Sequence, residues 1–169
     1  MSVYERITDP RFWQEPHEDC NCGSFALGVN TWFQPYDNGG EYTFGAREAL
    51  MREMWEEGHT REYIMDTIIE LDQEEILRQC PWVEPVLLQN TKPEDRIVAY
   101  RLSLDKDDFE MGEFDEDYHF RVRIDGAWFE KCGEDPIEFC GLCAEKTPWR
   151  AGRFLTYDGK IKYFRFKEI

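Results

Sequence analysis

Two side chains far apart in the sequence have the types that a thiol nucleophile requires. Cys22 lies in the segment DCNCGSF (residues 19–25), at the start of a predicted helix, and His119 lies in a predicted strand. A cysteine attacks a carbonyl as its thiolate, and a helix N-terminus or a neighbouring imidazolium lowers the pKa of a thiol. If the two side chains meet, they form a thiolate–imidazolium pair suited to amide chemistry.

The cysteines also offer a second chemistry, because cysteine and histidine are usual zinc ligands. The chain has one C-x-C and one C-x-x-C pair, and Cys132 and His119 could contribute as well. A zinc-binding protein would use the thiols of Cys20, Cys22, Cys140 and Cys143. The C-x-C spacing and the separation of more than one hundred residues disfavour this site. We therefore expect no metal and no other cofactor.

An acidic run precedes His119. Residues 105–117 contain eight carboxylates, with Lys106 as the only cation in the run. An EF-hand loop needs glycine at its sixth position, where this run has Glu110, so the calcium motif fails. We interpret the run as a solvated loop between strands, which in an enzyme would overhang the cleft and select cationic substrates.

Hydrophobic spacing predicts the helices that must position Cys22. One helix starts near Asp19 and ends near Asn30, with one apolar face formed by Cys22, Phe25, Ala26 and Val29. Residues 44–57 form an amphipathic helix that Gly58 stops. Thr60 caps the next helix, and a short third helix runs over residues 72–79 before Pro81.

The second half of the chain has the β-branched and aromatic content of strands. Strands are predicted over residues 96–104, 118–124, 127–131, 154–157 and 161–166. Asp125-Gly126 is a hairpin turn that joins the second strand to the third, and Asp158-Gly159 joins the last two by the same signal. Helices followed by strands indicate an α+β domain with an antiparallel sheet.

Length and composition indicate one acidic domain. A chain of 169 residues can bury a sizeable core without disulfides. The net charge of −16 disfavours direct binding of nucleic acid. Without a signal-peptide pattern or an apolar run of roughly 18 residues, we expect a cytoplasmic protein with reduced thiols and no membrane contact. Residues 1–19 should be irregular, because Pro10 and Pro16 prevent a long helix.

Three segments resemble one family of enzymes. Residues 21–27, NCGSFAL, are similar to the N-C-x-x-[YF]-A-L box of papain-like cysteine peptidases of the NlpC-related kind. Residues 117–133 resemble the D-Y-H-F-Y-R…D-G-x-W-S-H-K-x-G pattern of little-characterised bacterial and phage members of this group. Residues 137–141, IEFCG, are similar to their Y-x-x-F-C-G-Y-F segment. The resemblance extends from residue 20 to about residue 145.

This resemblance implies a papain-like fold in one domain of residues 1–169. A nucleophile helix would pack on an antiparallel sheet formed by residues 96–169, with residues 44–79 as a helical insert. The first core strands of that sheet would carry the histidine and then a polar orienting residue.

The resemblance also implies roles for individual residues. Cys22 matches the nucleophile and His119 matches the base. Glu130 stands where the family pattern has a histidine, and a carboxylate can orient an imidazolium as the aspartate of a triad does. The backbone N–H of Cys22, together with Asn21 or Gln14, would hold the oxyanion.

Three functions remain open on these grounds, and the zinc-binding protein described above is the third. The first is a cytoplasmic cysteine hydrolase or acyltransferase, bacterial or encoded by a phage, that cleaves or transfers a peptide or amide bond of a peptide or protein substrate. The acidic surface would favour a basic substrate. The second is a non-catalytic acidic protein on the same scaffold, such as an inhibitor that captures a basic host protein or imitates a nucleic acid.

Overall fold

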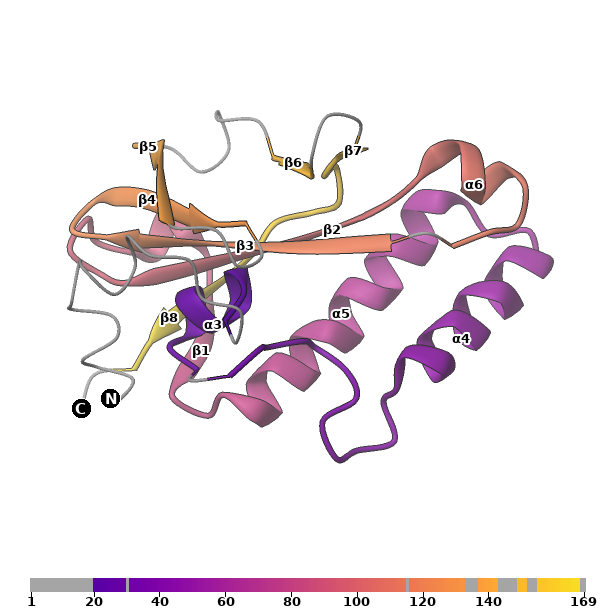
Figure 1. Cartoon of the computed structure of the whole chain (residues 1–169), viewed down its shortest axis with the longest axis horizontal. Coiled ribbons are helices and arrows are strands. Elements are labelled where there is room, and N and C mark those ends of the chain that lie inside the picture. Colours follow the sequence, from indigo (N-terminus) through magenta and orange to yellow (C-terminus); the bar gives the residue numbers. More distant parts are fainter. Residues whose placement is uncertain are drawn as a thin grey trace.

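The computed structural model is an α+β protein built on a six-stranded antiparallel sheet (Figure 1). It describes residues 20–29, 31–114, 116–132, 137–142, 149–151 and 155–167. The expected irregular segment 1–19 lies outside these residues. The sheet consists of β1 (Val83–Val86), β2 (Ile97–Leu104), β3 (Glu116–Ile124), β4 (Ala127–Lys131), β5 (Ile137–Gly141) and β8 (Lys162–Phe166). Its spatial order is β1-β8-β2-β3-β4-β5.

Four α-helices lie in the described part of the chain. They are α3 (Cys22–Leu27), α4 (Phe44–Glu56), α5 (Arg61–Gln79) and α6 (Lys106–Glu110), and a 3₁₀ turn covers Leu88–Asn90. The predicted helices at 44–57 and after Thr60 are confirmed, and the Thr60 side chain accepts from the Tyr63 amide. The separate helix at 72–79 is wrong, because α5 continues through this segment with Ile76 on its buried face.

The helix that carries Cys22 is shorter than predicted. Its N-cap is Asn21, and it ends at Leu27, where Gly28 takes the left-handed conformation with φ 72°. The side chains of Asn21 and Ser24 form a capping box, each accepting from the other's backbone amide. These caps determine the ends of a helix of only six residues.

The strands around His119 follow the predicted pattern. The hairpin of β3 and β4 turns at Asp125 and Gly126, which have φ of 50° and 81°, as a tight hairpin turn requires. The acidic run, in contrast, is not only loop, because residues Lys106–Glu110 form α6 with Asp105 as N-cap.

The predicted final hairpin is wrong. β8 pairs with β1 and β2, whereas β7 (Leu155–Thr156) pairs with β6 (Arg150–Ala151). The reason lies at Gly159, whose amide donates to the Leu102 carbonyl at 3.0 Å. A Cβ at Gly159 would lie 2.4 Å from that oxygen, so the glycine permits a close approach to β2 instead of a hairpin turn.

The sheet separates two apolar cores. On the face covered by α3 and α5, the buried side chains include Phe25, Ile68 and Phe120. On the other face, β6 and β7 lie over the sheet (Figure 1), and Trp149 and Tyr157 join a core with Ile97, Ala99, Trp128 and Cys140. No helix of the described segments is long and apolar enough to cross a membrane.

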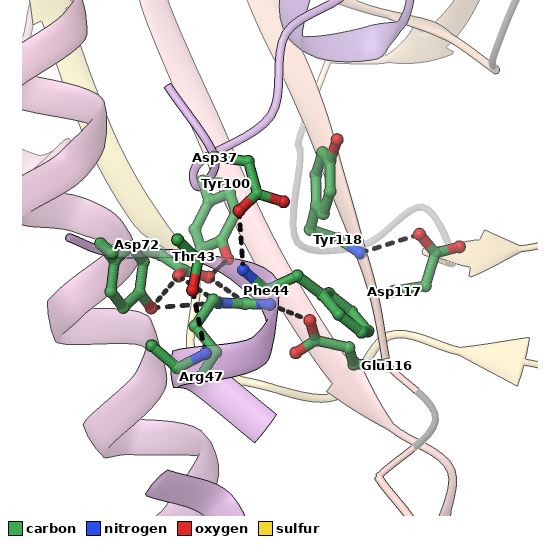
Figure 2. A network of polar contacts seen from close by, with 11 residues as sticks. Asp37, Thr43, Phe44, Arg47, Asp72, Tyr100, Glu116, Asp117 and Tyr118 are labelled. Carbon is green, nitrogen blue, oxygen red and sulfur yellow. Dashed lines mark hydrogen bonds and ion pairs between the residues drawn. The ribbon is translucent and has the colours of Figure 1, made fainter. Parts of the chain in front are cut away.

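A buried polar network ties α4 and α5 to the sheet (Figure 2). Arg47, on α4, donates Nε to Asp72 Oδ1 at 3.0 Å and Nη2 to Oδ2 at 2.8 Å. Asp72 also accepts from the hydroxyls of Tyr42 and Tyr100, and Arg47 pairs with Glu116 at the start of β3. Because both members of the central ion pair are fully buried, their hydrogen bonds must compensate for lost hydration.

Candidate active site

The local structure around Cys22 depends on its two neighbours. The Asn21 side chain accepts from the amides of Ser24 and Phe33 and donates to the Phe33 carbonyl at 2.6 Å. Gly23 packs against the Phe33 ring so closely that a Cβ would lie 2.7 Å from Cδ1. Residues 21–24 are thus clamped to Phe33, and Cys22 becomes the first residue of α3 in a defined position.

His119 meets the thiol of Cys22 from the sheet. Helix α3 packs against β3 and β4, and the His119 side chain, which is 5% exposed, lies close enough to Cys22 for the thiol to influence the imidazole. Burial alone would lower the pKa of His119, but the interactions with Cys22 and Glu130 outweigh it and raise this pKa to about 9. The imidazole is therefore held as a cation beside the thiol at neutral pH.

Glu130 completes a chain of three polar groups. Its Oε2 atom lies 2.9 Å from His119 Nε2 and accepts from Arg121 Nε at 3.0 Å. Burial raises the pKa of Glu130, but the interactions with His119 and Arg121 overcome this effect and hold it below its usual value. Since Nε2 meets the carboxylate, Nδ1 is the nitrogen that the thiol can share without breaking the histidine–glutamate pair.

Aromatic rings fix the plane of the imidazole. Tyr157 stacks on His119 with ring centroids 5.6 Å apart and an interplanar angle of 24°. Trp149 makes an edge contact with His119 at 5.8 Å and lies under the Arg121 guanidinium at 4.2 Å. The Tyr157 hydroxyl donates to Asp117 Oδ2 at 2.7 Å, so this ring is itself anchored to β3.

The cysteine side chains differ in their exposure to solvent. Cys22 is 7% exposed, whereas Cys132, which directly follows β4, is exposed to solvent. The thiols of Cys80 and Cys140 lie in the cores, where burial raises the pKa of each to about 12. Cys80 and Cys140 are therefore poor nucleophiles.

The remaining predicted site residues have different placements. Asn21 is buried, and its amide caps α3 and holds Phe33, while its oxyanion role stays a prediction. Gln14 and Cys143 lie outside the described residues. Among the described residues, the potential metal ligands that gather in a group of three are His119, Glu130 and Cys132, and this group does not include Cys20, Cys22 or Cys140.

Sequence reasoning missed three residues around His119: Arg121, Trp149 and Tyr157. The first had a signal, because side chains alternate along a strand and Arg121 therefore shares a face with His119. The sequence held no signal for Trp149 and Tyr157. They come from segments about 30 and 40 residues downstream, whose packing follows no local pattern.

Fold and site together define an α+β protein in which a buried histidine is paired with a glutamate and lies beside a cysteine at the start of a helix. Comparison of the chain with protein-family models, with curated proteins and with solved structures finds no match in any of the three. The interpretation of the site therefore depends on its own geometry.

Proposed function

We propose that this protein is a cysteine hydrolase or acyltransferase that acts on a peptide or amide bond, with Cys22 as nucleophile, His119 as general acid and base, and Glu130 as the orienting carboxylate. The carrying observation is that one buried imidazole lies beside Cys22, which raises its pKa, and is paired with Glu130 at 2.9 Å. A thiol, a base and an orienting group in this order are the arrangement that activates a cysteine. The resemblance of residues 21–27 and 117–133 to papain-like peptidases supports the same roles.

The proposed reaction has two steps. The Cys22 thiolate attacks the carbonyl carbon, the C–N bond breaks, and the imidazolium of His119 gives its proton to the leaving amine. Water, or an amine or thiol in a transfer reaction, then attacks the thioester, and neutral His119 takes its proton. Cleavage of the thioester C–S bond returns Cys22 as thiolate and leaves His119 as imidazolium.

The first test is selective alkylation of Cys22. In a Cys132→Ser background, which removes the exposed thiol of the site, iodoacetamide at pH 7 should modify Cys22 before Cys80 and Cys140, as measured by peptide mass mapping. His119→Ala should slow modification of Cys22 by at least about 10-fold, because the thiolate loses its imidazolium. His59→Ala is the matched control, since His59 is a partly exposed histidine on a loop, and this change should leave the rate unaltered.

The second test is acyl transfer. A reactive ester such as p-nitrophenyl acetate should give a burst of nitrophenolate and an acetyl group on Cys22. His119→Ala should abolish the burst, and Glu130→Gln should reduce it less, because the thiol and base remain. A Cys22 that reacts no faster than Cys80, and takes up no acetyl group, would refute the proposed nucleophile.

A second candidate function is favoured by the low exposure of Cys22, which is 7%. A thiol with so little free surface suits a scaffold that binds a partner without catalysis, and the net charge of −16 suits a basic partner. This function predicts slow alkylation of Cys22 in the wild-type protein together with salt-sensitive binding to a defined basic protein such as a histone. Rapid His119-dependent alkylation would contradict it.

A further inference from the structure

The candidate active site contains a second thiol that the proposed reaction does not use. Cys132 follows β4, and its sulfur, a ring nitrogen of His119 and a carboxylate oxygen of Glu130 all lie within 4.8 Å of one another. Cys132 is exposed while His119 is buried, so the group of three has one side open to solvent. This group, which we name the His-Glu-Cys cluster, offers one nitrogen, one oxygen and one sulfur.

This set of donor atoms favours zinc. Thiolate and imidazole together favour Zn²⁺ over Mg²⁺ or Ca²⁺, which prefer oxygen. Zinc bonds of about 2.0–2.3 Å place two tetrahedral ligand atoms roughly 3.5 Å apart. To reach a common ion, the sulfur of the exposed Cys132 side chain would move inward by about 1 Å, and His119 Nε2 and Glu130 Oε2, now 2.9 Å apart, would separate by roughly 0.5 Å.

The surroundings of the His-Glu-Cys cluster favour reversible binding of the ion. Three protein ligands leave one coordination position of a tetrahedral ion for water, as in open zinc sites. The Arg121 guanidinium, bonded to the same Glu130 oxygen that meets His119, places a positive charge next to the ion and weakens its binding. Tyr157 and Trp149 hold the imidazole in its plane, so the His119 ring can bind the ion without turning.

We propose that Zn²⁺ binds reversibly to His119, Glu130 and Cys132 and thereby blocks the Cys22 nucleophile. Binding forms a Zn–S, a Zn–N and a Zn–O bond and releases the Cys132 proton and the imidazolium proton to solvent. The ion takes the place of the proton between His119 and Glu130, so the imidazole can no longer act as acid or base for Cys22. The blocking part rests on the proposed function, whereas the binding part does not.

The binding test uses the full chain with thiols kept reduced by a phosphine that does not chelate. Zn²⁺ is titrated in competition with a chromophoric chelator, and Co²⁺ serves as a spectroscopic probe of thiolate ligation. We expect one ion per chain, no competition by Mg²⁺, and at least about 10-fold weaker binding in Cys132→Ser. Cys132 is exposed, so this substitution should leave the fold intact, which thermal unfolding checks.

Cys22→Ser and Cys140→Ser are the matched controls and should retain the ion. If these two variants lose it while Cys132→Ser keeps it, the ion uses the C-x-C and C-x-x-C thiols and the His-Glu-Cys cluster is wrong. Equal affinity in the wild type and Cys132→Ser, or no binding at all, also overturns the site. Retained binding in Cys22→Ser supports it even if Cys22 proves unreactive.

The blocking test follows alkylation of Cys22 by mass mapping. Stoichiometric Zn²⁺ should slow this reaction at least about 10-fold in the wild type, with recovery on adding EDTA, and should have little effect in Cys132→Ser. If Zn²⁺ binds at the cluster but Cys22 reacts at an unchanged rate, the blocking role is refuted and the binding site stands.

Discussion

At the scale of single residues, the missing side chain of Gly23 determines how Cys22 is positioned. A glycine inside a helix normally lowers stability compared with alanine, because it has more backbone freedom to lose. Here the missing Cβ lets the Phe33 ring approach, since a Cβ would lie 2.7 Å from Cδ1 and 3.1 Å from the Cβ of Phe33. The sequence NCGSF thus supplies the helix cap, the candidate nucleophile and, at Gly23, the close contact with Phe33 that holds both in place.

We predict that Gly23→Ala lowers the free energy of unfolding by about 1–3 kcal/mol, because overpacking against Phe33 outweighs the better helix propensity of alanine. Chemical denaturation monitored by circular dichroism measures this change.

Gly45→Ala is the matched control, because the nearest atom to a Cβ there is Thr43 Oγ1 at 4.0 Å. Gly45→Ala should leave stability equal or raise it by up to about 1 kcal/mol. A similar gain in both variants would show that Phe33 does not restrict position 23.

At the scale of elements, Arg47 determines how α4 and α5 are held to the sheet. The guanidinium bonds both oxygens of Asp72 on α5 and reaches Glu116 on β3 (Figure 2). It also lies 4.5 Å from the Tyr36 ring centroid. Glu116 begins the strand that carries His119, so this network and the candidate active site share one strand.

We predict that Arg47→Met destabilises the protein by about 3–5 kcal/mol, because Asp72 is left as a buried charge without its cation. Denaturant unfolding gives the value, and Glu48→Gln on the same helix is the control. The Glu48–Arg52 pair is 3.8 Å apart and about half exposed, so its loss should change stability by no more than about 0.5 kcal/mol. A loss below about 1 kcal/mol in Arg47→Met would refute the role of the network.

A second connection between elements depends on pH. Arg61, the first residue of α5, donates to both oxygens of Asp158 at 2.8 Å, and the Ser103 hydroxyl donates to Oδ1 at 2.7 Å. Burial raises the pKa of Asp158, but the bonds from Arg61 and Ser103 overcome this and hold the pKa below its ordinary value. A carboxyl with a lowered folded pKa stabilises the fold at pH values above its unfolded pKa, about 3.9 for aspartate.

We therefore predict that Asp158→Asn is less stable than the wild type at pH 7, and that the difference shrinks as pH falls below about 4. Denaturant titrations between pH 7 and pH 2 measure the difference. Because Asp158 is about one third exposed, solvent screens part of the interaction. A difference that is the same at pH 7 and pH 2 would contradict the assigned cause.

At the scale of the whole molecule, the candidate site draws on both faces of the sheet. Cys22 comes from the core on the α3 side, whereas Trp149 and Tyr157 belong to the core on the other face and contact His119 there. The imidazole thus contacts side chains from both cores. Its orientation depends on both being packed.

We predict that Trp149→Ala costs about 3–5 kcal/mol, the usual range for a large buried aromatic, and slows alkylation of Cys22 because the His119 ring is less firmly held. Thermal unfolding and mass mapping measure the two effects. Trp32→Ala is the control, since Trp32 is 49% exposed and should cost less than about 1 kcal/mol. Slowed alkylation in Trp32→Ala as well would refute the specific role of Trp149.

Local patterns in the sequence predicted most of the elements. The Thr60 cap, the Asp125-Gly126 turn and the apolar content of residues 96–104 each act through neighbours a few residues away, so they can be recognised without the fold. The start of α3 was missed because Asn21 caps the helix while also bonding Phe33, a contact that the helical pattern does not contain. Its end was missed although Gly28, which stops the helix in the left-handed conformation, is a local signal. The pairing of β8 was missed for the same reason, since Gly159 meets Leu102 of a distant strand.

The sequence by itself determined which side chains could do chemistry, because a cysteine next to a helix cap and a histidine in a strand are defined by type and local spacing. Only the tertiary structure decided that His119 lies beside Cys22 and pairs with Glu130, that Arg121, Trp149 and Tyr157 surround it, and that Cys132 lies near it. These contacts join segments up to about 97 residues apart. They depend on sheet pairing and core packing, which no local pattern specifies.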